Sequence, residues 1–414
     1  MNKRRVVITG VGVVAPNGIG KDAFWQANME GRSGVSPLTC FDVTYLDTKI
    51  AGQVRDFDLA QFMPADLVKR VDRFVHLGLS AAKMALDDSR FDVAGLDKEK
   101  VGVIIGSGLG GVLFHEEQMM ACYEKGSHRL NPLGVPRVTP NAVSSHIAIH
   151  FGFTGPNMVI STACASGTHA VGEALRKVQQ GDVDVCVTGG AEAPISQGTF
   201  GAYCALRVLS KRNDAPQAAS RPFDKGRDGF VLSEGAGILV LEELERARNR
   251  GAHIYAEVIG YAANSGAHHI VMPDATGKDA TRVMAAALKD AGLMGKSIDY
   301  INAHATSTSA NDSAETRAIK EVFGQAAYKI PVSSTKSMIG HSIGAAGGIE
   351  AVVCALCLEH QFIPPTINLT EPDPECDLDY VPNKGRQAKL DTVMSNSFGF
   401  GNCNACLVFS KLKG

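Results

Sequence analysis

The sequence has few aromatic residues, no excess of charge of either sign and no long apolar run. Phe, Trp and Tyr make up 6% of the 414 residues, with a single Trp, which argues against an aromatic-rich binding module. The 41 Lys and Arg residues balance 43 Asp and Glu residues, so the net charge of −2 gives no global attraction to nucleic acid or anionic lipid. No apolar run reaches the ~18 residues that a membrane-spanning helix requires.

The first residues resemble a secretory signal only superficially. A basic stretch at 1–5 precedes an apolar stretch at 6–15, but Thr9, Gly10 and Gly12 interrupt it and no small-residue cleavage site follows. We therefore expect a buried strand there. Ten cysteines without regular spacing are typical of reduced thiols rather than of a disulfide framework, which indicates a cytoplasmic protein.

Short β-branched runs alternate with helical patterns along a chain that is 45% hydrophobic and holds 44 Gly residues. Strands are predicted at 5–9, 101–105, 158–161, 183–188 and 238–241, and in the second half near 253–259, 300–303 and 331–334, with a terminal pair near 393 and 407. An amphipathic pattern predicts one helix over 67–88, with Lys69, Arg70 and Arg73 on its outer face. We expect an α/β protein with two βαβ-type halves, residues 1–251 and 252–414.

The motif TACASG at 162–167 places Cys164 where an apolar strand meets the start of a helix. Backbone N–H groups and the dipole at a helix start favour a thiolate and can hold the oxyanion of an acyl-transfer intermediate. A buried Cys is also a common small core residue, so this motif alone leaves both interpretations open.

Two later motifs place further reactive groups at strand ends. His304 emerges in NAHATST (302–308), and Lys336 and His341 lie in a Ser- and Gly-rich turn, SSTKSMIGH (333–341). Glu350 follows on an apolar helix of small residues, an uncommon place for a carboxylate. Open α/β sheets build their sites at the carboxyl ends of strands, so one thiol, two imidazoles and an amine there fit a thioester-handling site.

Three other patterns are weaker. GSGLGG at 106–111 contains GxGxxG after a strand, but no acidic residue follows about 20 residues on, which argues against a dinucleotide site. The two CxxC pairs, at 354–357 and 403–406, are too far apart for a zinc ribbon, and we interpret them as core residues. His268 and His269 are expected on the surface.

Together these motifs resemble the elongating β-ketoacyl-[acyl-carrier-protein] synthases of type II fatty acid synthesis, most closely the synthase II type. The resemblance spans nearly the whole chain: VVITGVG (6–12), TACASG, the stretch from 213 to 237, NAHATST, SSTKSMIGH, PPTINL (364–369) and SNSFGFG (395–401). It implies a thiolase-like fold, with two related βαβαβαββ halves in a five-layered αβαβα arrangement, a dimer and an acyl-carrier-protein partner. We expect neither a cofactor nor a metal.

The resemblance also implies roles for individual residues. Cys164 is similar to the nucleophile that takes the acyl chain, and His304 and His341 to the pair that assists decarboxylation and stabilises the enolate. Lys336 is similar to the lysine that tunes this cluster, and Glu350 to the buried acid that orders it. The remaining assignments are Phe400 in the acyl gate and oxyanion hole, Thr306 and Thr308 on the pantetheine arm, Leu109, Gly134 and Tyr203 in substrate binding, and Lys69, Arg70 and Arg207 in carrier-protein docking.

The sequence departs from the family pattern in three places. Ala305 replaces the usual Gly after the first histidine, and Asn402 stands in the gate loop where Gly is typical. Gly134 aligns with a position that is often aromatic and closes the acyl pocket of the neighbouring subunit. We therefore hypothesise a deeper pocket, running past Leu109, and a relaxed chain-length limit.

Several functions remain open at this point. The first is fatty acid elongation by a homodimer. The same chemistry could serve a type II polyketide or polyene system as its ketosynthase subunit, paired with an unlike partner. Cys164 with both histidines argues against a non-catalytic chain-length subunit, and SSTKSMIGH does not resemble a degradative thiolase, which uses coenzyme A and a second catalytic cysteine. The lone GxGxxG supports an oxidoreductase only weakly.

Overall fold

The computed structural model describes residues 3–293 and 298–413. Ten of its strands follow one another across a large hydrogen-bonded sheet, in the order β11-β10-β14-β15-β9-β1-β8-β7-β5-β6, and β2 is added beside β1. The strands are β1 (Val6–Ala15), β2 (Gly18–Ile19), β5 (Val101–Gly106), β6 (Asn157–Ile160), β7 (Val185–Glu192), β8 (Gly235–Glu243), β9 (Ala256–Ser265), β10 (Tyr300–Asn302), β11 (Val332–Ser333), β14 (Thr392–Gly399) and β15 (Cys403–Ser410). Two small antiparallel sheets of two strands each stand apart: β3 (Val35–Pro37) with β4 (Ile50–Gly52), and β12 (Phe362–Ile363) with β13 (Arg386–Gln387).

The sheet repeats one topology twice. Outward from the central pair, the first half runs β1-β8-β7-β5-β6 and the second half runs β9-β15-β14-β10-β11. In both halves the first two contacts are antiparallel and the last two are parallel. The two central strands, β1 and β9, pair over only two residues, so a short contact joins the two halves of the sheet.

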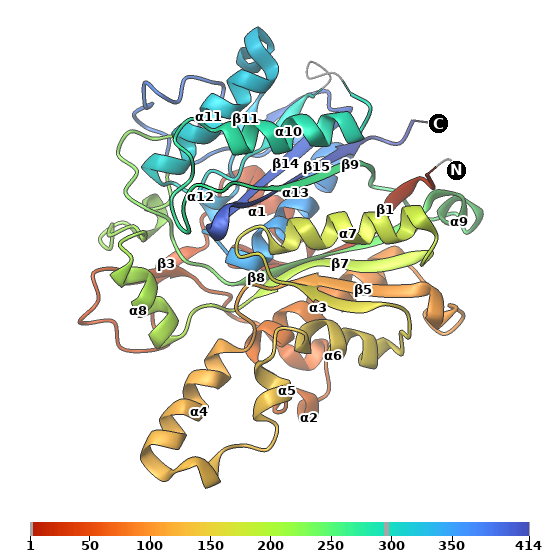
Figure 1. The fold of residues 1–414 in the computed structure, drawn as a ribbon, viewed down its shortest axis with the longest axis vertical. Helices are drawn as coiled ribbons and strands as arrows, with labels where there is room; N and C mark the ends of the chain where they lie inside the picture. The colour runs from red at the N-terminus through yellow and green to blue at the C-terminus, as the bar shows by residue number, and fades with distance from the viewer. Residues whose placement is uncertain (1–2, 294–297, 414) are drawn as a thin grey trace.

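Helices complete five layers (Figure 1). The longer helices are α1 (Lys21–Glu30), α3 (Arg73–Ser89), α4 (Val112–Lys125), α6 (Ala142–Phe151), α7 (Ser166–Gln180), α8 (Gln197–Ala205), α10 (Lys278–Asp290), α11 (Ser309–Phe323) and α13 (Ala346–His360). The short ones are α2 (Ala65–Val68), α5 (Gly134–Val138), α9 (Leu244–Asn249) and α12 (Lys336–Ile339). Helices α7 and α13 contact each other and strands of both halves, α3 packs on β1 and β8, and α10 packs on β9 and β15.

The middle layer is tightly packed because its helices carry small residues. A Cβ atom added to Gly348 of α13 would lie 2.3 Å from the backbone nitrogen of Gly190 and 2.4 Å from the carbonyl oxygen of Gly237. Helix and sheet backbones therefore meet directly there. One helical stretch, Ile343–His360, is long and apolar enough to cross a membrane by length and composition, contrary to the sequence prediction, and 89% of it is buried inside the protein.

Two sequence predictions need correction. The helix predicted over 67–88 is broken, because Asp72 caps the start of α3: its carboxylate accepts from the backbone N–H groups of Phe74 (3.4 Å) and Phe114 (2.8 Å). Arg73 turns inward and pairs with the buried Glu234 at 2.6 Å, so it does not lie on an outer face.

The second correction concerns β6, predicted as a buried strand near 158–161. It is the last strand of the sheet, and Asn157 and Met158 are exposed. The other four strands predicted in the first half are confirmed, and those three named by range in the second half correspond to β9, β10 and β11.

Candidate active site

Cys164 lies on a strained turn between β6 and α7. The residue before it, Ala163, has a φ of 50°, a left-handed conformation that non-glycine residues rarely adopt. The turn aims the Cys164 side chain at the cavity beside the first turn of α7, and the thiol is almost fully buried. A Cβ atom on Gly399 would come 2.8 Å from the carbonyl oxygen of Thr162, so the end of β14 packs directly on the turn.

The Cys164 thiol lies beside an imidazole and two backbone donors, the N–H groups of Phe400 and of Cys164 itself. The Sγ atom lies 3.0 Å from Nε2 of His341. Burial raises the pKa of Cys164 to about 11, while the Phe400 N–H and the positive charge of Lys336 act in the opposite direction. Because the Phe400 N–H is directed at the same sulfur, it is also placed to donate to an oxyanion formed on a Cys164 thioester.

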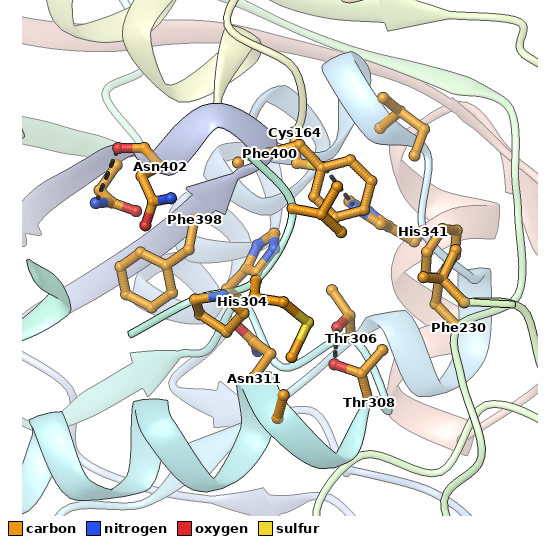
Figure 2. Close-up of a pocket in the computed structure, with 18 residues that line it drawn as sticks. Cys164, Phe230, His304, Thr306, Thr308, Asn311, His341, Phe398, Phe400 and Asn402 are labelled. Carbon is orange, nitrogen blue, oxygen red and sulfur yellow. Dashed lines mark hydrogen bonds between the residues drawn. The ribbon is translucent and has the colours of Figure 1, made fainter. Parts of the chain in front are cut away.

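The two histidines face the cavity together (Figure 2). The His304 and His341 ring centroids are 5.4 Å apart and the ring planes are nearly perpendicular. Burial, with the charge of Lys336 second, holds the pKa of both rings well below the usual range, so both are neutral. Their Nδ1 atoms are buried and unpartnered among the described residues. A buried N–H group without an acceptor costs more free energy than a buried nitrogen lone pair without a donor. We therefore place the proton of each neutral ring on Nε2, which makes Nε2 the hydrogen-bond donor.

Each histidine is fixed through its backbone. The His341 N–H donates to the Val231 carbonyl (2.8 Å), and the Ser233 N–H donates to the His341 carbonyl (3.0 Å), which ties the turn after α12 to the first half of the chain. The His304 N–H donates to Oε1 of Glu315 at 3.0 Å.

Lys336 and Glu350 form an ion pair behind the histidines. Both side chains are almost completely buried, at 2% and 1% exposure, and Nζ contacts the carboxylate. Burial raises the pKa of Glu350 to about 7, against the lowering effect of Lys336. The fixed positive charge of Lys336 in turn disfavours protonation of both imidazoles.

Glu315 is a residue that the sequence analysis missed. It lies on α11, is 1% exposed, and accepts from the backbone N–H groups of His304 and Ala305 and from the Asn396 amide. Burial raises its pKa to about 7. Its only sequence signal is a carboxylate among the small residues of 309–318, a pattern that equally suits a solvent-facing helix.

Cys164, His304 and His341 lie on the wall of a cavity of about 130 Å³, which Figure 2 shows in close-up. Thr306 and Thr308 lie on its wall with their hydroxyl oxygens 3.0 Å apart. Aromatic rings not singled out from sequence complete it: Phe230 packs edge-on against His341, and Phe398 against His304. The lining residues are Cys164, Val208, Phe230, Val271, Met272, Pro273, His304, Thr306, Thr308, Ala310, Asn311, His341, Ile343, Phe398, Gly399, Phe400, Asn402 and Asn404.

The other predicted site residues lie outside this lining. Tyr203 packs on Phe230 in the apolar cluster that includes Cys164, and Leu109 lies in the turn after β5. Gly134 begins α5, and nothing lies within 4 Å of the position of a Cβ atom there. The predicted docking residues Lys69, Arg70 and Arg207 are all exposed.

The two CxxC pairs and the His268-His269 pair lie outside the candidate site. Cys354, Cys357 and Cys406 are buried, Cys403 is half-buried, and His268 and His269 are exposed. Within residues 3–293 and 298–413 there is no cluster of three His, Cys, Asp or Glu side chains arranged to hold a metal ion.

Two family models cover most of the chain. The β-ketoacyl synthase N-terminal domain matches residues 3–247, and the β-ketoacyl synthase C-terminal domain matches residues 255–370. The chain belongs to the β-ketoacyl synthase family. It is 48% identical to a 3-oxoacyl-[acyl-carrier-protein] synthase 2 from Synechocystis, with 99% of both chains covered, and 47% identical to the protein of that name from Coxiella burnetii, with 100% of both covered.

Solved ketosynthases share the fold. One match is a structure of a type II polyketide synthase acyl-carrier protein in complex with its ketosynthase, bound to the hexaketide, with a TM-score of 0.92 and 36% sequence identity. Another is the ishigamide ketosynthase/chain length factor, with a TM-score of 0.93 and 35% sequence identity. Each comparison covers 99% of this chain and 100% of the other. The predicted thiolase-like fold is thereby confirmed.

Proposed function

We propose that this β-ketoacyl synthase elongates acyl chains in fatty acid synthesis. It condenses an acyl group carried on Cys164 with malonyl-[acyl-carrier protein], releases CO₂ and forms β-ketoacyl-[acyl-carrier protein]. The observation that carries this proposal is the buried cluster in which Cys164 lies 3.0 Å from His341, with His304 and Lys336 behind it. The names of relatives at 43–48% identity, all 3-oxoacyl-[acyl-carrier-protein] synthase 2, support the same reaction.

The first half-reaction is acyl transfer. Cys164 Sγ attacks the carbonyl carbon of an acyl thioester, the bond from that carbon to the carrier sulfur breaks, and the thiol proton passes to the departing pantetheine sulfur. His341, whose Nε2 faces Sγ, is placed to donate a hydrogen bond that stabilises the Cys164 sulfur as its proton leaves. The Phe400 N–H and the Cys164 N–H are placed to stabilise the tetrahedral oxyanion.

The second half-reaction forms the carbon–carbon bond. The bond between the malonyl methylene and its carboxylate breaks, and the electron pair left on carbon is delocalised onto the thioester oxygen. Two neutral imidazoles with Nε2–H donors in a water-poor cavity suit that enolate. The carbon then attacks the acyl-Cys164 carbonyl, and the released thiolate regains a proton.

Substrate delivery follows from the positions of the predicted residues. Thr306 and Thr308 line the cavity and offer two hydroxyls to the amides of a pantetheine arm. Lys69, Arg70 and Arg207 are exposed cations suited to an acidic carrier protein. One solved relative described as a ketosynthase is bound to its acyl-carrier protein, which supports this partner.

A second copy of the chain is the expected partner in a dimer. Among the described residues, the outer edge of β6, the last strand of the sheet, pairs with no other strand. Met158 on β6 and Ile149 on the adjacent α6 are exposed apolar residues. The segment containing α4 and α5, which carries Gly134, projects from the body in Figure 1. Through it Gly134 would reach the acyl pocket of the partner, and Leu109 and Tyr203 would line that of its own chain.

The proposal extends to organisation and location. Residues 1–251 and 252–414 form the two related halves, the first with the nucleophile and the second with both histidines and Lys336; the repeated strand order supports this division. The reaction uses carrier proteins of the cytoplasm, where we place the enzyme. The polyketide or polyene alternative is not favoured, because the ketosynthase structures of that kind are 35–36% identical and the synthase 2 relatives 43–48%.

Intact-protein mass spectrometry tests the proposal. Wild type and Cys164→Ala are mixed with acyl-carrier proteins of increasing chain length and then with malonyl-carrier protein. We expect acyl adducts on wild type alone, and condensed product only after malonyl-carrier protein is added. Wild type that forms no adduct with any acyl chain would contradict the assignment of Cys164 and the homodimeric enzyme together.

A further inference from the structure

The glycine-rich turn after β5 binds a carboxylate of the chain itself. In GSGLGG (106–111), the N–H groups of Gly108 and Leu109 and the Ser107 hydroxyl all donate to Glu192, at 2.6, 3.2 and 3.0 Å. A Cβ atom on Gly108 would lie 2.9 Å from the Glu192 carboxylate, so glycine is required for this approach. Such turns commonly cradle phosphates, and here the anion is Glu192, the last residue of β7.

The same carboxylate holds a second turn, the one that follows His341. The Gly344 N–H donates to Glu192 at 3.1 Å, and a Cβ atom on Gly344 would lie 2.4 Å from the Glu192 oxygen. Ile343 just before it has a φ of 48°, a conformation that a β-branched residue adopts only when its surroundings enforce it. Four donors from two turns thus fill the acceptor sites of one fully buried carboxylate.

Both turns belong to the acyl side of the site. Ile343 lines the cavity with Cys164, and the Gly108 carbonyl accepts from the Ser161 hydroxyl (3.1 Å), which ties the first turn to the strand that leads to Cys164. Glu192 also acts electrostatically on Cys164 and Tyr203, raising the pKa of each. Burial raises the pKa of Glu192 itself to about 7, against the four hydrogen bonds.

We infer that Glu192 is a positioning residue that fixes the acyl-binding wall of the site. It holds the Leu109 turn and the strained Ile343 together beside Cys164, so that a long acyl chain meets a preformed pocket. The reacting atoms do not touch Glu192. This inference rests on the proposed function. It is paralleled in the second half, where the buried Glu315 holds the turn of His304 in the same way, through consecutive backbone N–H groups.

Glu192→Gln tests the inference, because Gln keeps the volume but turns an amide NH₂ toward two of the four donors. Rates of Cys164 acylation by acetyl-, octanoyl- and dodecanoyl-carrier protein are measured by intact mass, and CO₂ release from malonyl-carrier protein is measured separately. We expect octanoyl and dodecanoyl transfer to fall on the order of 10- to 100-fold, the effect of one or two unsatisfied buried donors. Acetyl transfer and decarboxylation should change by less than about threefold.

Glu242→Gln is the matched control. Glu242 is an equally buried strand carboxylate, paired with Arg246 and Arg250, and lies outside both turns. The Glu242→Gln variant should have a lower unfolding temperature than wild type but the same ratio of acetyl- to octanoyl-transfer rates. Glu192→Asp, which keeps the charge, should recover part of the octanoyl rate.

An unchanged acetyl-to-octanoyl ratio in Glu192→Gln, or a uniform loss for all chains like that of a destabilised control, would overturn the inference. If Glu192→Gln does not fold, Ser107→Ala is tested instead, since it removes a single donor to Glu192. An unchanged ratio of acetyl- to octanoyl-transfer rates in Ser107→Ala would also overturn the inference. Wild type is measured in parallel. Absence of acylation in wild type would instead refute the proposed function.

Discussion

Breaking the buried Lys336–Glu350 pair should destabilise the protein more than removing the pair entirely. Both side chains are at most 2% exposed, so Lys336→Met leaves the Glu350 carboxylate without its cation in a water-poor interior. We expect a loss of about 3–5 kcal/mol in the free energy of unfolding. Adding Glu350→Gln removes the stranded charge, and the double variant should return to within about 1 kcal/mol of wild type.

The deficit of Lys336→Met should also depend on pH. The folded-state pKa of Glu350 is about 7, already above its ordinary value of 4.5, and loss of Lys336 removes the main effect that lowers it. A carboxyl whose pKa is higher in the folded state binds its proton more tightly there, so folding is favoured at low pH and weakened as pH rises from 4.5 through the folded-state pKa. The deficit should therefore be smaller at about pH 5.5 than at about pH 8.

Trp25 provides the readout. It is the single tryptophan, is 4% exposed and stacks on His360 with ring centroids 5.2 Å apart, so its fluorescence reports global unfolding in urea. Wild type, both single variants and the double variant are unfolded at the two pH values. A double variant no more stable than Lys336→Met, or a deficit that grows toward low pH, would refute the stranded-charge explanation.

Four further predictions address the reaction. His304→Ala should leave acylation of Cys164 within about tenfold of wild type but slow CO₂ release from malonyl-carrier protein on the order of 100-fold or more, measured as separate half-reactions; equal losses in both would contradict its assignment to the enolate. Because burial raises the pKa of Cys164 to about 11, its iodoacetamide alkylation rate should keep rising with pH up to about pH 9, and a plateau below about pH 8 would count against that environment. Gly134→Phe should shorten the longest acyl chain accepted, scored by product mass, and an unchanged distribution would exclude a deep pocket. Lys69→Glu with Arg70→Glu should raise KM for acyl-carrier protein about tenfold at low salt, with kcat unchanged, and an effect insensitive to salt would exclude electrostatic docking.

Residues with a strong local signal were predictable from sequence. The strand-to-helix position of Cys164 and the strand-end position of His304 follow from hydrophobic periodicity and turn residues, and the structure brings both to one cavity. The division into two halves was predicted from the alternation of strands and helices, whereas the expectation that the halves are related followed from the resemblance, since a single sequence gives no direct signal of which strands pair. The strand order then shows the repeat plainly.

Other features depend on tertiary contacts that local sequence does not encode. Periodicity favours a continuous helix over 67–88, but Asp72 gains hydrogen bonds from Phe74 and from the distant Phe114, and this ends the pattern. The strand β6 is apolar without being buried, because burial there depends on what lies beyond the edge of the sheet. Glu192 could not be recognised, since its donors lie in turns far away in the sequence. The donors to Glu315 are closer along the chain, but they are backbone N–H groups, which leave no mark in the sequence.

The two halves explain why those carboxylates are needed. In each half a turn follows the fourth strand from the centre, β5 or β10: one carries Leu109, and the other carries His304, which lines the cavity. Both turns leave their strand with consecutive N–H groups pointing into a water-poor interior, and a buried polar group without a partner is costly. A buried glutamate satisfies both donors in each case, Glu192 from β7 and Glu315 from α11. Each half therefore satisfies the donors of its turn with its own buried glutamate. In the function proposed above, one of these turns shapes the acyl pocket and the other carries a histidine that stabilises the enolate.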